Sequence, residues 1–271
     1  MNKGQISNTL RKLRILYPLD KLRYQIEKRK NKKANHKFKN DNPDVLLPPD
    51  YLMYESFQIN YSKYYFGGKE SAKWILGQLG KHKNMTGKKI LDWGCGPGRI
   101  IRHMPNLSKN QSSFYGTDYN EESIRWCKSK VKNVNFNHNN LVAKLPYEDE
   151  IFDAIYGISI FTHLSKEMHF NWFSELKRIL KPEGILLITT QGGNFKKKLT
   201  EVERKKFDEG KLIVRGNVKE GHRTYCAFHP DPFLKLLFED VEILDKIVIS
   251  PKNKSYVPQD RWILKKNKNG G

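Results

Sequence analysis

The stretch Lys88–Arg99, KKILDWGCGPGR, decides the fold. A short apolar run ends in a turn with glycine at positions 94, 96 and 98, and a helix is expected to follow. Glycine allows the backbone to approach a ligand closely and to reach positive φ. The dinucleotide fingerprint GxGxxG would need glycine at position 99, where arginine stands, and the GK[ST] of a P-loop is absent. The sequence therefore supports a ligand-binding loop but neither hydride nor phosphoryl transfer.

Strands and helices alternate outward from this loop, which predicts a Rossmann-like, doubly wound α/β fold with a seven-stranded, mostly parallel sheet. The last strand is expected to run antiparallel, because the turn-rich segment Ser250–Pro258 leaves no room for a crossover helix. The strands are expected at residues 90–91, 114–117, 134–136, 152–160, 185–190, 241–249 and 261–265. Helices are expected after the capping residues Asn120 and Ser165, around 71–79 and over 229–238.

Two acids stand at the ends of the first two strands. Asp118 follows Gly98 by 20 residues, where a carboxylate can accept both ribose hydroxyls of a nucleoside ligand. Each such charge-assisted bond contributes about 1.5–3 kcal/mol. Asp92 precedes the glycines, and an acid there suits a ligand that carries a cationic amine.

Four motifs in this order resemble class I S-adenosylmethionine (SAM) methyltransferases: ILDWGCGPGR, GTDYN, LPYEDEIFDAIYGISIFTHL and LKRILKPEGILLITT. The segments LPPDY, SIFTHL and TYCAFHP further resemble methyltransferases of bacterial glycan and natural-product pathways. The resemblance implies SAM as the cofactor. It also implies methyl transfer to a hydroxyl, or to an amine, of a small-molecule or sugar acceptor, in glycan biosynthesis.

The resemblance also implies site residues. Asp118 would hold the ribose and Tyr119 would pack on the adenine, while either Asn139 or Asn140 would contact the adenine amino group. Ile158 and Ser159 would lie beside the methionine portion. The full cofactor-binding set is Asp92, Gly94, Cys95, Gly96, Gly98, Asp118, Tyr119, Asn139, Asn140, Leu141, Ile158 and Ser159.

A hydroxyl acceptor benefits from a general base, and histidine has a suitable pKa. His163 follows the fourth strand, at the sheet edge where ligands bind in such folds. His229 is a second candidate, although His229-Pro230 could equally begin a helix without chemistry, and His222 is a third. No metal site is predicted.

The net charge of +21 motivates a rival, a nucleic-acid methyltransferase. Amino-methylating enzymes of that kind carry [DNS]PP[YFW] after the fourth strand, where this chain has Gly157-Ile-Ser-Ile. A non-catalytic SAM-binding or docking protein is the other alternative.

The excess charge is concentrated at the N-terminus, where residues 1–40 hold 13 basic and two acidic residues, a net of +11. We expect a basic amphipathic arm and linker over 1–46, a helical lid segment with many aromatics over 47–87, and a SAM-binding domain over 88–271 with an insertion at 191–227. The sequence of this arm predicts two short helices that are separated at Pro18, followed by a solvated linker over Lys28–Lys39.

The arm's apolar residues, Leu10, Leu13, Tyr17, Leu19, Leu22 and Ile26, admit two readings. The arm either attaches weakly to polyanions or anionic lipid, or packs on the catalytic domain or a second subunit. We expect SAM binding to survive deletion of residues 1–40.

No run of 18 apolar residues and no signal-peptide pattern occurs in the chain, and its three cysteines are scattered. The sequence therefore predicts a cytoplasmic protein, with a peripheral position at the inner membrane surface as an option.

Overall fold

The computed structural model describes residues 3–13, 15–109, 111–251 and 256–268. The chain forms two compact units. We call residues 17–140 the glycine-loop unit, and residues 1–16 together with 141–271 the C-terminal unit. Each is described by itself. No helix in the described ranges is long and apolar enough to cross a bilayer.

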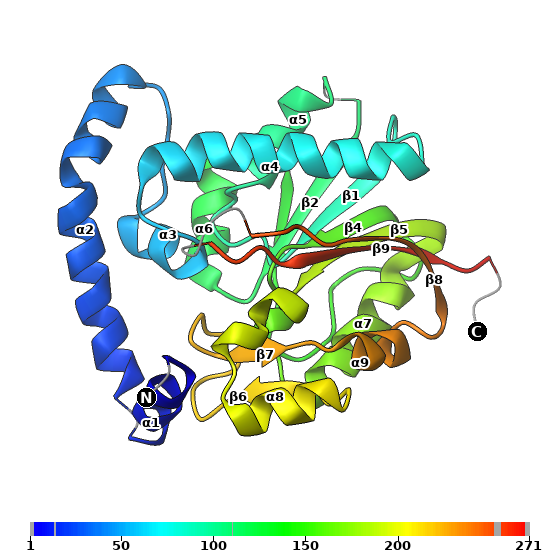
Figure 1. Ribbon diagram of the computed structural model, residues 1–271. Coiled ribbons are helices and arrows are strands. Elements are labelled where there is room, and N and C mark those ends of the chain that lie inside the picture. Colours follow the sequence, from blue (N-terminus) through cyan, green and yellow to red (C-terminus); the bar gives the residue numbers. More distant parts are fainter. Residues whose placement is uncertain (1–2, 14, 110, 252–255, 269–271) are drawn as a thin grey trace. The chain divides into compact units, whose positions relative to one another are not determined.

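The glycine-loop unit contains three parallel strands and the helices α2 to α6 (Figure 1). Its elements are α2 (Leu16–Asp41), α3 (Asp50–Ser56), α4 (Tyr61–His82), β1 (Lys89–Trp93), η1 (Ile101–His103), α5 (Met104–Leu107), β2 (Ser113–Asp118), α6 (Glu121–Lys130) and β3 (Asn135–His138). The strand β2 lies between β1 and β3, with Asp92 opposite Gly116 and Asp118 opposite His138. This register brings the ends of β1 and β2 together.

Helix α2 corrects two expectations. The break between the N-terminal helices lies before Leu16 rather than at Pro18, which stands in the first turn of α2, where a missing backbone N–H costs nothing. The predicted linker Lys28–Lys39 is wrong, because it is helical throughout. Lysine and arginine are good helix formers, and Asn35 and Phe38 supply a buried inner face.

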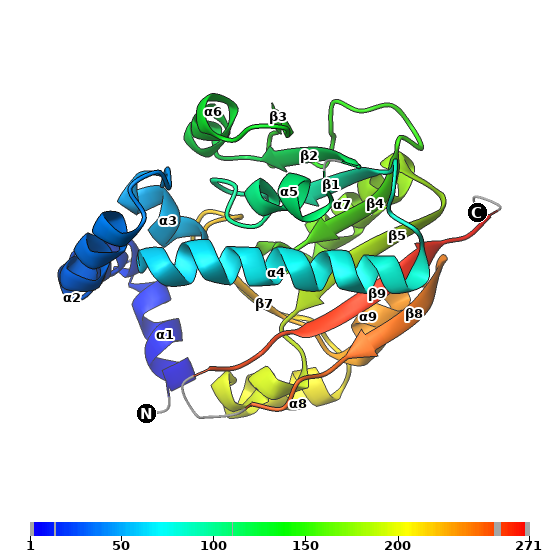
Figure 2. The same ribbon diagram turned by 90° about the horizontal axis from the view of Figure 1, so that it is seen from above.

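That inner face is held by specific contacts. Asn35 donates to the Ile59 carbonyl (2.8 Å) and accepts from the Tyr61 backbone N–H (2.9 Å), just where α4 begins. Phe38 packs in a core cluster with Met53, Tyr61 and Tyr64. In both ribbon views α3 lies beside the N-terminal end of α4 (Figures 1 and 2).

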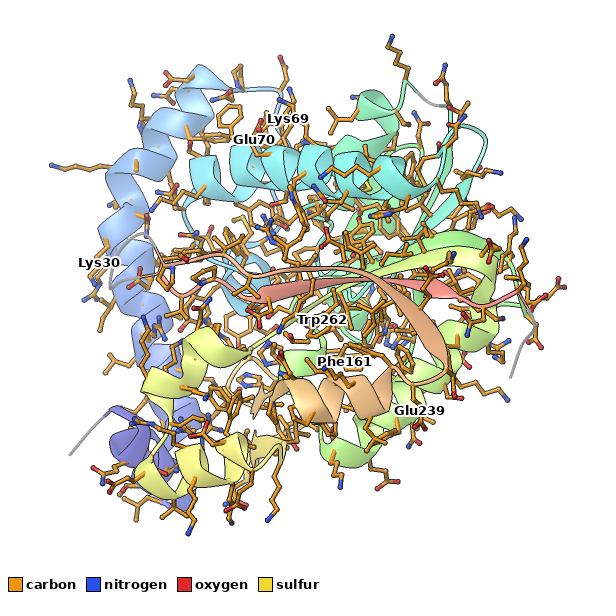
Figure 3. The ribbon with its side chains drawn as sticks, turned by 45° about the vertical axis from the view of Figure 1, so that its right-hand side comes forward. Lys30, Lys69, Glu70, Phe161, Glu239 and Trp262 are labelled. Carbon is orange, nitrogen blue, oxygen red and sulfur yellow. The ribbon has the colours of Figure 1, made fainter. Side chains whose placement is uncertain are left out.

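The C-terminal unit contains the other four strands of the large sheet and a small two-stranded sheet. Its elements are α1 (Lys3–Lys12), β4 (Phe152–Gly157), η2 (Phe161–His163), α7 (Lys166–Ile179), β5 (Leu180–Thr190), η3 (Gly193–Lys198), α8 (Glu201–Asp208), β6 (Ile213–Arg215), β7 (Cys226–Phe228), α9 (Asp231–Leu237), β8 (Val241–Ile247) and β9 (Asp260–Lys266). Figure 3 labels two of its core residues, Phe161 and Trp262, both at most 2% exposed.

The large sheet has seven strands in the order β3-β2-β1-β4-β5-β9-β8. The strand β9 is antiparallel to both β5 and β8, while the strand pairs β1–β2, β2–β3 and β4–β5 are parallel. The predicted Rossmann-like sheet with an antiparallel last strand is therefore confirmed. Residues 252–255 of the expected turn-rich connection lie outside the described residues.

The insertion at 191–227 is more ordered than a loop. It holds η3, α8, β6 and the beginning of β7, and Phe195, Leu199, Phe207, Ile213 and Phe228 form a core cluster of their own. Helix α1 is tied to it, because the buried Arg11 guanidinium donates to the carbonyl of Arg215 (3.1 Å).

Candidate active site

The glycine loop of the first unit has the conformation that its residues predict. Gly94, Gly96 and Gly98 have φ of 76°, 51° and 73°, a region that side-chain-bearing residues rarely adopt. The backbone N–H groups of Gly94 and Cys95 both donate to the Thr117 carbonyl at 2.8 and 3.0 Å. This bond pair fixes the loop against the end of β2.

Asp118 connects the loop to the following helix. Its Oδ2 accepts from the Gly96 backbone N–H and its Oδ1 from the Asn120 backbone N–H, both at 2.8 Å. The side chain is 8% exposed, and burial raises the pKa of this carboxyl. A carboxylate offers about four acceptor positions, so these two bonds leave capacity for two ribose hydroxyls.

The loop is also a negative environment. Asp92 and Asp118 are both buried. Burial first, and then the charge of Asp92, raise the pKa of the Cys95 thiol far above its usual range. Burial and the charge of Asp118 do the same to the pKa of Cys127. Neither thiol is therefore a nucleophile, and the two acids suit a cationic ligand such as a sulfonium with an ammonium group.

The two asparagines at the end of β3 differ. Asn139 is buried and accepts from the Thr117 hydroxyl (2.6 Å) while donating to the Asn140 carbonyl (2.7 Å), so it joins the ends of β2 and β3. The Asn140 side chain is exposed. Tyr119 is half-buried; burial, and then the charge of Asp118, raise its pKa.

The segment 47–87, which the sequence predicts as a lid, contacts the glycine loop directly. A Cβ on Gly96 would lie 3.1 Å from the Ser56 Cβ, and the Tyr64 hydroxyl donates to the Pro97 carbonyl (3.2 Å). A Cβ on Gly68 would lie 2.2 Å from the Arg99 carbonyl oxygen. The pair Gly67-Gly68 inside a helix was the available sequence signal for this close approach.

In the C-terminal unit, a closed polar network follows β4. Ser159 has φ of 68° although it is not glycine. Its N–H donates to the Thr189 hydroxyl (2.8 Å), which donates to Gln259 Oε1 (2.6 Å), and the Gln259 amide donates back to the Ser159 hydroxyl (2.8 Å). Three strand ends therefore fix a strained residue, and strain of this kind concentrates at functional sites. Ile158 beside it is half-buried, as is Leu141.

His163 lies in η2, four residues further. Its Nδ1 is 2.7 Å from the Tyr225 carbonyl, so Nδ1 carries the proton and donates. The Tyr225 turn is itself fixed, because the Gly221 N–H donates to the His163 carbonyl (3.0 Å) and Glu220 accepts from the Ser165 N–H. Burial lowers the pKa of His163, which keeps the imidazole neutral with Nε2 as the acceptor.

His229 has both ring nitrogens engaged. Its Nδ1 accepts from the Gln191 N–H (3.2 Å), so its Nε2 carries the proton and donates to Nε2 of His169 (2.9 Å). His169 in turn donates through Nδ1 to the Ser165 carbonyl (2.6 Å). Burial lowers the pKa of both, to about 4 for His169. The hydrogen-bonded imidazoles of His169 and His229 are therefore both neutral and buried. His222 Nδ1 lies 2.8 Å from the Thr224 hydroxyl within its own turn.

Known proteins resemble this chain in sequence and in fold. Residues 90–184 match the family described as a methyltransferase domain. A tRNA (carboxymethyluridine(34)-5-O)-methyltransferase of Arabidopsis thaliana is 35% identical over 130 residues, which are 46% of this chain and 29% of that protein. A ubiquinone/menaquinone biosynthesis C-methyltransferase of Wigglesworthia glossinidia brevipalpis is 29% identical over 129 residues, 45% of this chain and 48% of that protein.

Among solved structures, magnesium protoporphyrin IX methyltransferase from Synechocystis PCC 6803 with bound SAH superposes with a TM-score of 0.53 at 13% identity, covering 89% of this chain and 98% of that one. In the two comparisons by sequence, the chain spans less than half the length of each relative. The chain has the fold of class I SAM-dependent methyltransferases, and residues 90–184 match a methyltransferase domain, whose cofactor is S-adenosylmethionine.

Proposed function

We propose that the protein transfers a methyl group from SAM to a hydroxyl of a small-molecule or sugar acceptor, with His163 as the general base. The observation that carries this proposal is the hydrogen bond from His163 Nδ1 to the Tyr225 carbonyl. It fixes the ring and the tautomer, and it leaves Nε2 as a proton acceptor.

SAM, when bound, supplies an electrophilic methyl group on a sulfonium. We propose that Asp118 holds its ribose, that Asp92 and the backbone of Gly94–Gly98 bind its amino acid end, and that Tyr119 packs on the adenine. Asn140 is the better candidate for the adenine amino group, since the side-chain Oδ1 of Asn139 already accepts from the Thr117 hydroxyl. Ile158, Ser159 and Leu141 remain candidates for the methionine side.

His163 takes the proton of the acceptor hydroxyl as the carbon–oxygen bond forms, the carbon–sulfur bond to the methyl group breaks and S-adenosylhomocysteine leaves. Its lowered pKa keeps it neutral at pH 7 and so ready to accept that proton. An amine acceptor would need only to arrive deprotonated. Loss of His163 should therefore slow methylation of a hydroxyl acceptor but not of an amine acceptor. General-base assistance is typically worth about 10²–10⁴-fold in rate.

The test is release of S-adenosylhomocysteine from SAM with a panel of sugars, nucleotide sugars and small phenols, and with unmodified tRNA as a separate arm. Turnover with a hydroxyl acceptor that falls at least about 100-fold in His163→Gln, with unchanged SAM affinity, supports the proposal. Equal turnover of the variant on that acceptor removes His163 from the mechanism.

A second candidate is a nucleic-acid methyltransferase. It is favoured by the net charge of +21 and by a relative whose name specifies tRNA. Methylation in the tRNA arm alone, falling steeply between 50 and 200 mM salt, would select it over the small-molecule reading.

A further inference from the structure

Helix α2 presents an outer face whose side chains are exposed. Its inner face makes the Asn35 and Phe38 contacts described above. On the opposite side Leu19, Leu22 and Ile26 are 40%, 58% and 43% exposed. Their spacing of three and four residues places them on one face of the helix.

Basic residues surround this apolar strip and extend it toward the C-terminal end of the helix. Arg23, Arg29, Lys30, Lys33 and Lys37 are all exposed. Arg23, Arg29 and Lys33 make no ion pair with any described residue, while Lys30 lies 3.5 Å from Glu27. Figure 3 shows Lys30 on the outer edge of α2.

The acids of the helix neutralise only part of that face, because Glu27 and Asp41 pair with Lys30 and Lys37 and leave Arg23, Arg29 and Lys33. Asp20 accepts the Tyr54 hydroxyl at 2.8 Å and so is turned toward α3. Asp41, the last residue of the helix, lies 3.7 Å from Lys37. The outer face therefore combines exposed aliphatic side chains with uncompensated positive charge.

We propose that the outer face of α2 docks on an anionic lipid bilayer, with Leu19, Leu22 and Ile26 at the acyl boundary and the basic residues at the head groups. Apolar burial and attraction to anionic lipid act together at such a surface. A nucleic acid would use the charge but leave the aliphatic residues without a partner, and a second copy of this face would meet like charge.

The experiment is co-sedimentation of the full-length protein with vesicles of phosphatidylcholine alone and of phosphatidylcholine with 25% phosphatidylglycerol, at 0.1 and 0.5 M NaCl. We expect binding to the anionic vesicles at 0.1 M salt and little binding to the neutral ones. Leu22→Gln with Ile26→Gln should weaken binding about tenfold or more. The triple variant Arg23→Gln, Arg29→Gln, Lys33→Gln should weaken it further, at about fivefold per charge.

A matched control removes three equally exposed lysines from and after α6: Lys128→Gln, Lys130→Gln and Lys132→Gln. It has the same net charge as the triple variant, so near-native vesicle binding assigns the effect to α2. Equal loss in the control, or unchanged binding in the Leu22/Ile26 variant, would overturn the proposal. Loss of binding to a labelled RNA in the α2 charge variant, with vesicle binding intact, would instead identify a nucleic-acid surface.

Discussion

At the scale of single residues, Asp118 combines an observed contact with a proposed one in the same carboxylate. It fixes the backbone N–H of Gly96 and of Asn120, and it retains acceptor capacity toward a ligand. Asp118→Asn replaces one of the two oxygens by a donor that faces an N–H group. We expect the affinity for S-adenosylhomocysteine, measured by calorimetry, to fall about 10- to 100-fold, as for loss of one charge-assisted bond. Unchanged affinity would remove the ribose assignment.

Substitutions of His163 and of His229 should differ in their effects on turnover and on stability. His163→Gln should lower turnover while leaving the unfolding midpoint nearly unchanged. His229→Gln should instead lower stability, by about 1–3 kcal/mol, because it breaks the link to His169 and leaves buried polar atoms unpaired. Denaturant unfolding and turnover, measured on both variants, separate the roles. If His229→Gln retains full stability and loses only turnover, the assignments must be exchanged.

The pH dependence follows from the direction of the His163 shift. As the proposed base, His163 would work only when neutral, and burial lowers its pKa. Turnover should therefore stay constant as the pH falls through the ordinary histidine value of about 6.5, and decline only below it. The turnover of His163→Gln should not show this decline at low pH.

At the scale of elements, the side chain of Glu203 connects α8 to its neighbours. Glu203 completes the capping box with Thr200, pairs with Arg215 at 2.6 Å and accepts from Asn8 of α1 at 3.0 Å. Burial alone would raise its pKa, but the hydrogen bonds from Arg215 and Asn8 outweigh burial and lower the pKa to about 2. The stability from this carboxylate is present above about pH 4.5 and is lost as the pH falls through about 2.

Glu203→Gln should therefore cost up to about 3.5 kcal/mol at pH 7, at about 1.4 kcal/mol per pKa unit for a pKa lowered from 4.5 to about 2, and much less near pH 2. The matched control is Glu201→Gln, an exposed acid in the same first turn. Urea unfolding at both pH values provides the measurement. A cost that is equal at pH 7 and pH 2 would show that packing, not ionisation, carries the effect.

The elements around the glycine loop could be predicted because local signals agree there. Glycine spacing, the Asn120 and Ser165 caps and apolar strand cores all indicate the same structure, and both caps are made as expected. The strands from 113 to 138 differ from expectation by a residue or two at their ends. Lys181–Gly184 lies inside β5 but interrupts its regular pairing with β4, because the register passes from Phe152–Leu180 to Ala154–Ile185 and Glu183 has φ of 60°.

The remaining features depend on contacts distant in sequence. The network of Ser159, Thr189 and Gln259 joins residues up to 100 positions apart, and no local pattern signals it. The choice between His163 and His229 likewise needed the partner of each ring nitrogen. Lys28–Lys39 appeared too polar to pack, because two inward residues, Asn35 and Phe38, are a weak signal among so many lysines.

At the scale of the whole molecule, the arm is structural as well as exposed, which changes the expectation for its deletion. Removing residues 1–40 leaves the Ile59 carbonyl and the Tyr61 N–H without the Asn35 amide, and it takes Phe38 out of a core that includes Tyr64. Because the Tyr64 hydroxyl bonds the Pro97 carbonyl, the glycine loop loses support. We therefore expect the truncated protein to lose about 3–5 kcal/mol of stability and to bind S-adenosylhomocysteine more weakly.

The same reasoning gives a control that keeps the chain intact. Asn35→Ala with Phe38→Ala should reproduce most of the stability loss of the truncation, whereas Lys32→Ala with Lys33→Ala, on exposed positions of the same helix, should cost less than about 0.5 kcal/mol. Thermal unfolding with and without S-adenosylhomocysteine measures both effects. A truncated protein with native stability and native affinity would show that the inner face of α2 is dispensable and that only its outer face has a function.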